Sequence, residues 1–377
     1  MALIAYADGV HMAGVAPADV ARRCGVEDPE VLLGWTPAGP AWLADPELRG
    51  STFMAGYALA DAVRDRRLRY LPVRLGVVPS LLERLGPAVA VVPGQHRAGE
   101  LVFRGTTGIG PAAARAADAV VVEVDDEAPD LGGPPIPGRI VATVARAPDA
   151  VAPRQSRPGE DVDLAVGRNV VALFPDEPTL QLGPGGIADA IVASVDRPVR
   201  IWSGLLTDAA ARLDEPGLLV GTVTTAYTWG GEPIARLARA GRLALQPVEV
   251  THDVVAVSEI PRFVACNTAV QVGLDGSVNV ERVDGRAIAG IGGHADFSAA
   301  ASRSVDGLSV IALRSTDRRG RSTIVERVDV VSTPRCDVDV VVTEHGVADL
   351  RGLDDDARAA RLVAIAAPER RGELARS

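Results

Sequence analysis

The sequence predicts an α/β protein built from two open, mostly parallel sheets. Its 377 residues are about twice the length of a typical domain of roughly 150 residues. Hydrophobic residues make up 47% of the chain but aromatic residues only 3%, so the cores must be built from Ala, Val, Leu and Ile. Short apolar segments separated by helical stretches, in a chain of that composition, are typical of buried parallel strands.

The first predicted domain covers residues 1–150. Residues 1–68 carry helix-like patches at 17–23, where Pro17 suits a first helical position, and at 53–66, with a loop at 36–50 between them. From residue 69 strands and helices alternate. The predicted strands are 69–73, 88–92 and 117–124, and the predicted helices are 80–85 and 112–116.

The second predicted domain covers residues 151–377. Residues 144–160 lose hydrophobic periodicity and contain three prolines, which indicates a domain boundary near residue 150. Strands and helices then alternate again, and a glycine turn followed by a helix is predicted at 230–241. The predicted strands are 179–182, 199–203, 218–225, 243–248, 263–272, 308–314 and 338–343.

A glycine turn in the run TLQLGPGGIADA is the first candidate binding element. Gly183, Gly185 and Gly186 follow a short strand and precede a helix that opens at Ile187. Such a turn lets a ligand approach the backbone, and the helix amides favour an anion, although an ordinary strand-to-helix turn explains the same pattern. Ligands of open α/β sheets lie at the carboxyl ends of the strands, where we expect Gly183, Ser203, Gly230 and Asn267.

The turn also satisfies the dinucleotide pattern G-x-G-x-x-A. That pattern usually requires an acidic residue near the end of the next strand to hold the ribose. The next strand ends Ile201-Trp202-Ser203-Gly204, which contains no acid. A nicotinamide-dependent oxidoreductase is therefore disfavoured.

Composition excludes several other classes. All 39 basic residues are arginine, so lysine chemistry of the Schiff-base or P-loop kind is ruled out. The net charge of −10, without a basic cluster, argues against nucleic acid as a partner. Three widely spaced cysteines and the absence of an export signal or an apolar run of about 18 residues favour a cytoplasmic location without a membrane span.

Four motifs resemble the acetyl-CoA hydrolase and acyl-CoA transferase family, which includes 4-hydroxybutyrate and succinyl:acetate CoA-transferases. They are TLQLGPGGIADA, ACNTAVQVGLDGSVN (265–279), GIGGHADF (290–297) and VVVTEHGVADLRG (340–352). The resemblance is strong from about residue 178 onward and weaker over 50–150. It implies two α/β domains of the CoA-transferase type with the active site in the cleft between them. It also implies a homodimer or homotetramer that acts on an acyl-CoA and a small carboxylate, with no permanently bound cofactor and no metal.

The resemblance further implies a set of residues that bind coenzyme A. They are Gly183, Pro184, Gly185, Gly186, Ile187, Asn267, Val270, Gly292 and Gly293. In this family a glutamate carboxylate attacks the acyl thioester, and the released thiolate returns to form a glutamyl-CoA thioester. A carboxylate or water then resolves that thioester.

The sequence departs from the family at this nucleophile. The matching run is Trp202-Ser203-Gly204-Leu205, so Gly204 stands where the glutamate is expected. Glycine has no side chain that could attack a thioester. The nearest acids, Asp196 and Asp208, lie several residues away.

Two residues are candidates for a catalytic group that acts in place of the missing glutamate. His294, beside the glycine pair, could activate a water against a bound thioester, or it could simply hydrogen-bond a neighbouring loop. Glu232, after Gly230 and Gly231, could act as an acid or base, or it could be a solvated acid in the first turn of a helix.

Two further sets of polar residues are explained by structural roles rather than by catalysis. Glu249, His252 and Asp253 could bind a metal or relay protons, but a strand followed by a capped helix explains them. Glu344 suits a buried hydrogen-bonding role, and the acids at 354–356 suit a helix cap.

We therefore predict an acyl-CoA transferase or hydrolase that binds coenzyme A between its domains. The alternative from a different class is a catalytically silent acyl-CoA-binding protein, or the partner subunit of an active CoA-transferase. A Rossmann-type oxidoreductase is the third interpretation.

Overall fold

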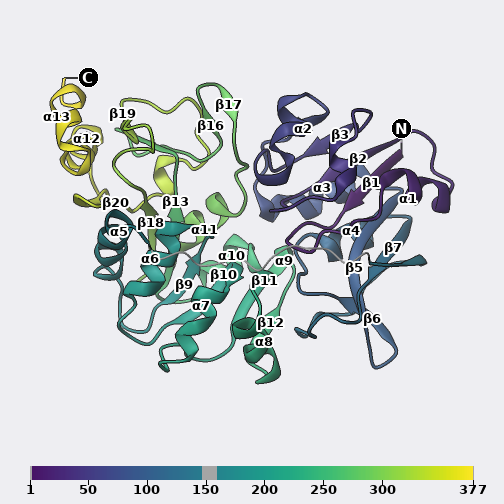
Figure 1. Cartoon of the computed structure of the whole chain (residues 1–377). Coiled ribbons are helices and arrows are strands. Elements are labelled where there is room, and N and C mark those ends of the chain that lie inside the picture. Colours follow the sequence, from purple (N-terminus) through teal and green to yellow (C-terminus); the bar gives the residue numbers. More distant parts are fainter. Residues whose placement is uncertain (1, 147–158, 377) are drawn as a thin grey trace. The chain divides into compact units, whose positions relative to one another are not determined.

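The computed structural model of the chain describes residues 2–146 and 159–376 (Figure 1). The chain forms two compact units. Unit 1 comprises Met1–Arg154, Thr224–His252 and Arg286–Gly292, and unit 2 comprises Gln155–Val223, Asp253–Gly285 and Gly293–Ser377. Unit 1 thus takes two segments from the later part of the chain. The boundary predicted near residue 150 falls within 147–158, outside the described residues.

Unit 1 contains a sheet with the strand order β4-β3-β2-β1-β5-β7-β8, to which β6 adds by pairing with β5. Its pairs are parallel except for the β5–β6 hairpin. The strands are β1 (Ala2–Tyr6), β2 (Pro29–Leu33), β3 (Gly50–Thr52), β4 (Leu68–Tyr70), β5 (Val89–Arg97), β6 (Glu100–Phe103), β7 (Ala119–Val124) and β8 (Ile140–Ala145).

The helices of unit 1 confirm part of the sequence prediction. Three of them match the predictions at 17–23, 80–85 and 112–116 within two residues at either end. The helices are α1 (Pro17–Cys24), α2 (Ala60–Arg64), α3 (Val78–Leu85), α4 (Gly110–Ala116), α8 (Glu232–Arg239) and α9 (Val248–Thr251). Of the predicted helix over 53–66, only a 3-10 turn at Tyr57–Leu59 and α2 form.

The prediction for residues 1–68 missed three strands. The run ALIAY forms β1, which lies inside the sheet between β2 and β5 with its last three residues buried. A five-residue apolar run that is buried on both faces shows no alternation, so periodicity cannot separate it from a helix segment. The strands β6 and β8 were missed as well.

Unit 2 contains a run of strands in the order β10-β9-β13-β18-β20-β21. The pairs are parallel except for β20–β21. The strands are β9 (Thr179–Leu182), β10 (Arg200–Thr207), β13 (Phe263–Thr268), β18 (Leu308–Ala312), β20 (Val340–Thr343) and β21 (Gly346–Asp349). The mixed α/β architecture with large, mostly parallel sheets confirms the predicted fold class.

Three predicted strands of the second half differ clearly in their bounds. The strand predicted at 218–225 begins later, as β11 (Val223–Trp229), and β12 (Leu243–Leu245) ends before α9. The strand predicted at 263–272 ends at Thr268, and a separate β14 (Gln271–Gly273) follows it. The strand β14 belongs to a small sheet with β15 (Val278–Asn279) and β19 (Ile324–Val325).

The helices of unit 2 pack on its sheets or on one another. They are α5 (Asp161–Val171), α6 (Gly186–Ser194), α7 (Asp208–Ala211), α10 (Val254–Ser258), α11 (His294–Ala301), α12 (Asp355–Ile365) and α13 (Pro368–Leu374). Every residue of α11 is buried, which is possible because its surface is mostly small and apolar. Phe297 of α11 lies 6.2 Å from the ring of Phe263 on β13 and holds the helix against that strand.

Side-chain caps confirm two interpretations made from the sequence. The Asp253 carboxylate accepts hydrogen bonds from the backbone N–H groups of Val255 and Ala256 at the start of α10. Asp354 caps α12 in the same way through Ala357 N. These carboxylates satisfy helix donors that would otherwise lack partners.

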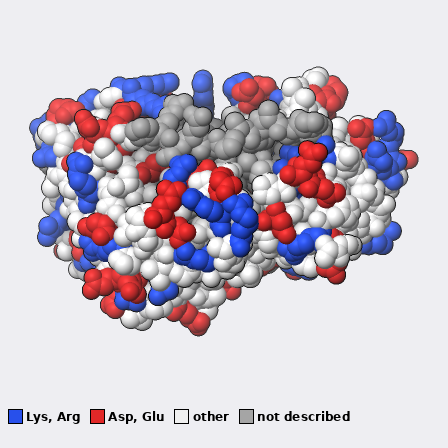
Figure 2. Space-filling model, turned by 60° about the horizontal axis from the view of Figure 1, so that its bottom comes forward, with Lys and Arg blue, Asp and Glu red and all other residues white. Residues whose placement is uncertain are grey.

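Acidic and basic side chains lie interspersed over the face shown in Figure 2. Ion pairs form between solvent-accessible side chains of unit 2, where Arg321 pairs with Asp317 at 2.7 Å and with Asp284 at 3.0 Å. None of the described helices has the length and apolar character that a membrane crossing requires.

Candidate functional site

Three residues follow the stretch in which β9 pairs with β10 and β13 in the unit 2 sheet. Thr179 of β9 lies opposite Arg200 of β10 and Phe263 of β13. The pairing continues to Leu180–Ile201 on one side and to Leu182–Cys266 on the other. Gly183 and Asn267 therefore each follow a paired residue directly, and Gly204 lies three residues beyond Ile201 in β10. We call Gly204, Gly183 and Asn267 the edge row.

Ser203 connects β10 to the end of β9 through its side chain. Its hydroxyl donates to the carbonyl of Leu182 at 2.9 Å and accepts from the Leu182 N–H at 3.2 Å. Ser203 is buried inside β10, which continues to Thr207, so it does not project from the end of a strand as the sequence suggested.

The glycine turn next to the edge row is open. A Cβ atom at Gly183 or Gly185 would meet nothing within 4 Å. Gly185 has φ 148°, a conformation that L side chains rarely adopt, and it precedes α6 without a side-chain cap. The first N–H groups of a helix have no partner within the helix, so α6 presents donors to an anion at this turn. Pro184 supplies no N–H, and Ile187 is half-buried in the first turn of α6.

A partly buried ion pair flanks the turn, and sequence reasoning missed it. The Oδ2 atom of Asp163 lies 3.2 Å from the position of a Cβ at Gly186. Arg314 donates from Nε and Nη2 to the two carboxylate oxygens of Asp163, each at 2.7 Å, and from Nη1 to Glu160 at 3.0 Å. These hydrogen bonds raise the pKa of Arg314. Arg314 therefore neutralises a carboxylate that would otherwise repel an anion, and 151 residues separate the pair, so no local motif reveals it.

Asn267 joins the edge row to α11. Its Nδ2 donates to Ser298 Oγ at 3.2 Å and to the His294 carbonyl oxygen at 3.4 Å. The structure therefore brings together Asn267 and His294, which the sequence singled out separately.

The ring of His294 is buried and held on one side. Its Nδ1 lies 2.7 Å from the hydroxyl oxygen of Thr333, whereas its Nε2 is buried without a hydrogen-bond partner among the described residues. Burial lowers the pKa of His294 to about 4, although the backbone carbonyl of Thr268 acts to raise it. The ring is therefore neutral at pH 7.

The other residues predicted to bind coenzyme A are divided between the two units. Val270 N donates to the carbonyl of Asn279 at 3.0 Å, and Gly293 is the N-cap residue of α11, both within unit 2. Gly292 has φ 59° and belongs to unit 1, where its carbonyl accepts from Leu75 N at 2.9 Å.

Glu232 is the first residue of α8 in unit 1. Its side chain is 69% exposed and pairs with Arg239 of the same helix. That arrangement is the one expected for a solvated acid in a first helical turn.

The remaining polar candidates have structural partners. Glu249 pairs with Arg115, and Thr251 Oγ1 lies 2.8 Å from Nδ1 of His252. Glu344 accepts from the backbone N of Ser315 at 2.9 Å and from its hydroxyl at 2.6 Å. Within residues 2–146 and 159–376, no cluster of three or more His, Cys, Asp or Glu side chains could hold a metal ion.

Unit 1 contains a buried acid that sequence reasoning also missed. Asp8 follows β1 and is fully buried, and its Oδ1 accepts from Ile109 N at 3.2 Å. Burial raises the pKa of Asp8 to about 6, although hydrogen bonds from Ile109 and Tyr227 act to lower it. Nearby, Trp35 contacts Tyr227 and Trp229 edge to face.

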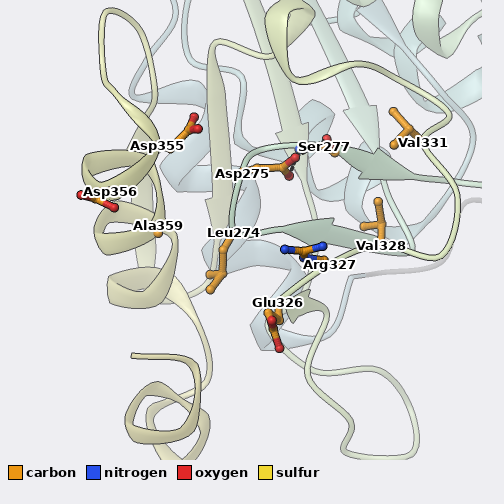
Figure 3. Close-up of a pocket in the computed structure, with 10 residues that line it drawn as sticks. All are labelled: Leu274, Asp275, Ser277, Glu326, Arg327, Val328, Val331, Asp355, Asp356 and Ala359. Atoms are coloured by element: carbon orange, nitrogen blue, oxygen red, sulfur yellow. Dashed lines mark hydrogen bonds between the residues drawn. The ribbon is translucent and has the colours of Figure 1, made fainter. Parts of the chain in front are cut away.

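A separate cavity of about 610 Å³ in unit 2 is acidic (Figure 3). It is lined by Leu274, Asp275, Ser277, Glu326, Arg327, Val328, Val331, Asp355, Asp356 and Ala359. Four acidic residues and one arginine line it, Asp355 pairs with Arg335 at 2.7 Å, and Ser277 Oγ donates to Asp275 at 2.8 Å. A phosphate-bearing ligand is therefore favoured at the turn of α6 over this cavity.

Comparison with known proteins gives a consistent picture. Residues 234–377 match the family described as Acetyl-CoA hydrolase/transferase C-terminal domain. The chain is 30% identical to 4-hydroxybutyrate coenzyme A transferase of Clostridium kluyveri, over 86% of this chain and 81% of that protein. It is 26% identical to acetyl-CoA hydrolase of Eremothecium gossypii, over 85% of this chain and 72% of that protein. A solved 4-hydroxybutyrate CoA-transferase from Porphyromonas gingivalis superposes with a TM-score of 0.74 at 26% identity, covering 100% of this chain and 92% of that one.

Proposed function

Because the chain belongs to the acetyl-CoA hydrolase and transferase family, we propose that it binds an acyl-CoA thioester at the edge row and either transfers the coenzyme A to an acceptor carboxylate or hydrolyses the thioester. Its relatives include CoA-transferases and acetyl-CoA hydrolases. The observation that carries the proposal is that Gly183 and Asn267 directly follow the paired residues Leu182 and Cys266, between the open turn of α6 and the start of α11.

The turn of α6 is suited to the anionic part of coenzyme A. Its helix donors attract phosphate, and the pairing of Asp163 with Arg314 removes the local negative charge that would oppose binding. The open space at Gly183 and Gly185 lets a chain as thin as pantetheine pass close to the backbone. We assign Gly183–Ile187, Asn267, Val270, Gly292 and Gly293 to coenzyme A binding on this basis and on the family resemblance.

The chemistry must differ from a route through a glutamyl intermediate at position 204, because Gly204 has no carboxylate. In hydrolysis, water attacks the thioester carbonyl, the C–S bond breaks, and the thiolate of coenzyme A takes up a proton. In direct transfer, the acceptor carboxylate attacks the carbonyl to give a mixed anhydride. The released thiolate then attacks the acceptor's carbonyl in the anhydride, which frees the original acyl group as a carboxylate.

Two residues are proposed as catalytic groups. His294 adjoins the edge row through Asn267, and Glu232 is the second candidate. The substrates would be an acyl-CoA and a small carboxylate, as the names of the relatives suggest. We further propose a cytoplasmic homodimer or homotetramer without a permanently bound cofactor.

One observation favours a second function. Gly204 supplies no nucleophile, and burial makes His294 a weak base, so the chain could bind acyl-CoA without turning it over. It would then act as a catalytically silent acyl-CoA-binding protein or as the partner subunit of an active CoA-transferase.

Three assays separate these functions. The protein is incubated with acetyl-CoA alone, with acetate and with succinate, while free thiol and the exchange of labelled coenzyme A are followed. Free thiol without acceptor indicates a hydrolase, succinate-dependent formation of succinyl-CoA indicates a transferase, and neither product together with stabilisation by coenzyme A indicates a silent binder. Stabilisation by NAD but not by coenzyme A would overturn the proposal.

A further inference from the structure

We propose that His294 donates a hydrogen bond from its Nε2–H group to the carbonyl oxygen of a bound thioester, and that Thr333 is the positioning residue that keeps the proton on Nε2. The inference rests on the proposed acyl-CoA site and assigns His294 a role other than that of a base.

Thr333 decides which ring nitrogen carries the proton. A neutral imidazole has one donor and one acceptor nitrogen, and a hydroxyl group can donate. When Thr333 Oγ1 donates to Nδ1 across 2.7 Å, the ring proton must lie on Nε2.

Thr333 is itself held firmly. It is fully buried, and its backbone N donates to the carbonyl of Val278 at 3.2 Å. The preceding Ser332 donates from its hydroxyl to the buried Glu281 at 2.6 Å and accepts from Val280 N at 3.1 Å. This network fixes the hydroxyl that faces the ring.

The other side of the ring makes no hydrogen bond of good geometry. His294 is 9% exposed, and its Nε2 is buried without such a bond to any described residue, although the backbone carbonyl of Thr268 acts on the ring. A buried donor without a partner is unfavourable unless a ligand supplies an acceptor. The hydrogen bond from Asn267 to the His294 carbonyl places this residue beside the edge row, where the proposed function puts the thioester.

The neutral state of the ring suits a donor. Burial lowers the pKa of His294 to about 4, so the ring does not readily take a proton from water at pH 7. A neutral N–H group can still stabilise negative charge that develops on a carbonyl oxygen.

Ligand binding tests the donor without requiring turnover. Acetonyl-CoA carries a ketone oxygen and no hydrolysable thioester, whereas S-propyl-CoA has the same chain length without that oxygen. We expect the full-length protein to bind acetonyl-CoA about tenfold more tightly, which corresponds to one net hydrogen bond. His294→Leu should lower that ratio to about one, and His294→Gln, which keeps an amide donor but cannot act as a base, should retain about threefold.

The outcomes separate the inference from the function on which it rests. Failure of both compounds to bind would overturn the proposed function together with the inference. Equal binding of both by the unsubstituted protein, with coenzyme A binding intact, would overturn only the inference.

A second measurement reads the tautomer without any ligand. In protein labelled with ¹⁵N-histidine, we expect His294, assigned by its loss in His294→Gln, to show a protonated Nε2 and an unprotonated Nδ1. Thr333→Val should abolish this preference, and Thr333→Ser should restore it. A proton on Nδ1 in the unsubstituted protein would contradict the assignment.

Discussion

The hydroxyl of Tyr227 donates a 2.9 Å hydrogen bond to Oδ2 of Asp8, although 219 residues separate the two in the sequence. Both side chains are buried. The bond connects the end of β1 to β11 and so helps to hold residues 224–252 within unit 1. Burial of the pair raises the pKa of both groups, with Asp8 reaching about 6.

Asp8 should make unit 1 more stable on mild acidification. Its pKa is about 6 in the folded state and near 3.8 when unfolded, so the folded state binds more protons between these values. Its contribution to the free energy of unfolding therefore increases as the pH falls, by about 1 kcal/mol from pH 7 to pH 5. Urea unfolding of the wild type and Asp8→Asn at several pH values checks this. An unchanged difference between the two proteins across that range would rule out the titration of Asp8.

His252 should have the opposite effect. Burial lowers its pKa to about 3, whereas the unfolded side chain titrates near 6.5, so the unfolded state binds more protons in between. Its contribution to stability is present above about pH 6.5 and declines by about 2 kcal/mol at pH 5. His252→Gln, which does not titrate, should lose less stability over this range in the same unfolding measurement. Parallel pH curves for the two proteins would contradict the shift.

The glycine turn offers a matched pair of substitutions. Gly185→Ala must adopt φ 148° and should lower the free energy of unfolding by about 1–2 kcal/mol. Gly183→Ala meets open space without a positive φ, so it should change stability by no more than about 0.5 kcal/mol. Its methyl group should nevertheless weaken coenzyme A binding, as measured by calorimetry. Unaltered affinity in Gly183→Ala would move the coenzyme A site away from this turn.

Gly204→Glu should create or raise CoA-transferase activity. The substitution places a carboxylate on β10 at the position where the family's glutamate is expected, from which we expect it to attack the thioester and form the glutamyl-CoA intermediate. Gly204→Gln has nearly the same shape and no nucleophile, so it should not gain activity. The assay follows exchange of labelled coenzyme A between acetyl-CoA and succinate. Coenzyme A binding without any gain in Gly204→Glu would argue against our placement of this residue.

Several strands and one helix of the second half could be predicted from local patterns in the sequence. The run TLQLGPGG predicted β9, the turn and α6, and the strands at 308–314 and 338–343 appear as β18 and β20 with slightly different ends. The first strand, β1, could not be predicted, because a short apolar run of five residues has no periodicity that separates a strand from a helix.

By itself, the sequence determined the fold class, the family motifs and the absence of a carboxylate at Gly204, because each is a property of residue type and of local order along the chain. Only the tertiary structure decided that Asp163 pairs with Arg314, that Thr333 faces His294 and that Tyr227 reaches Asp8. Contacts between segments so far apart depend on strand register and side-chain packing, which no local pattern encodes.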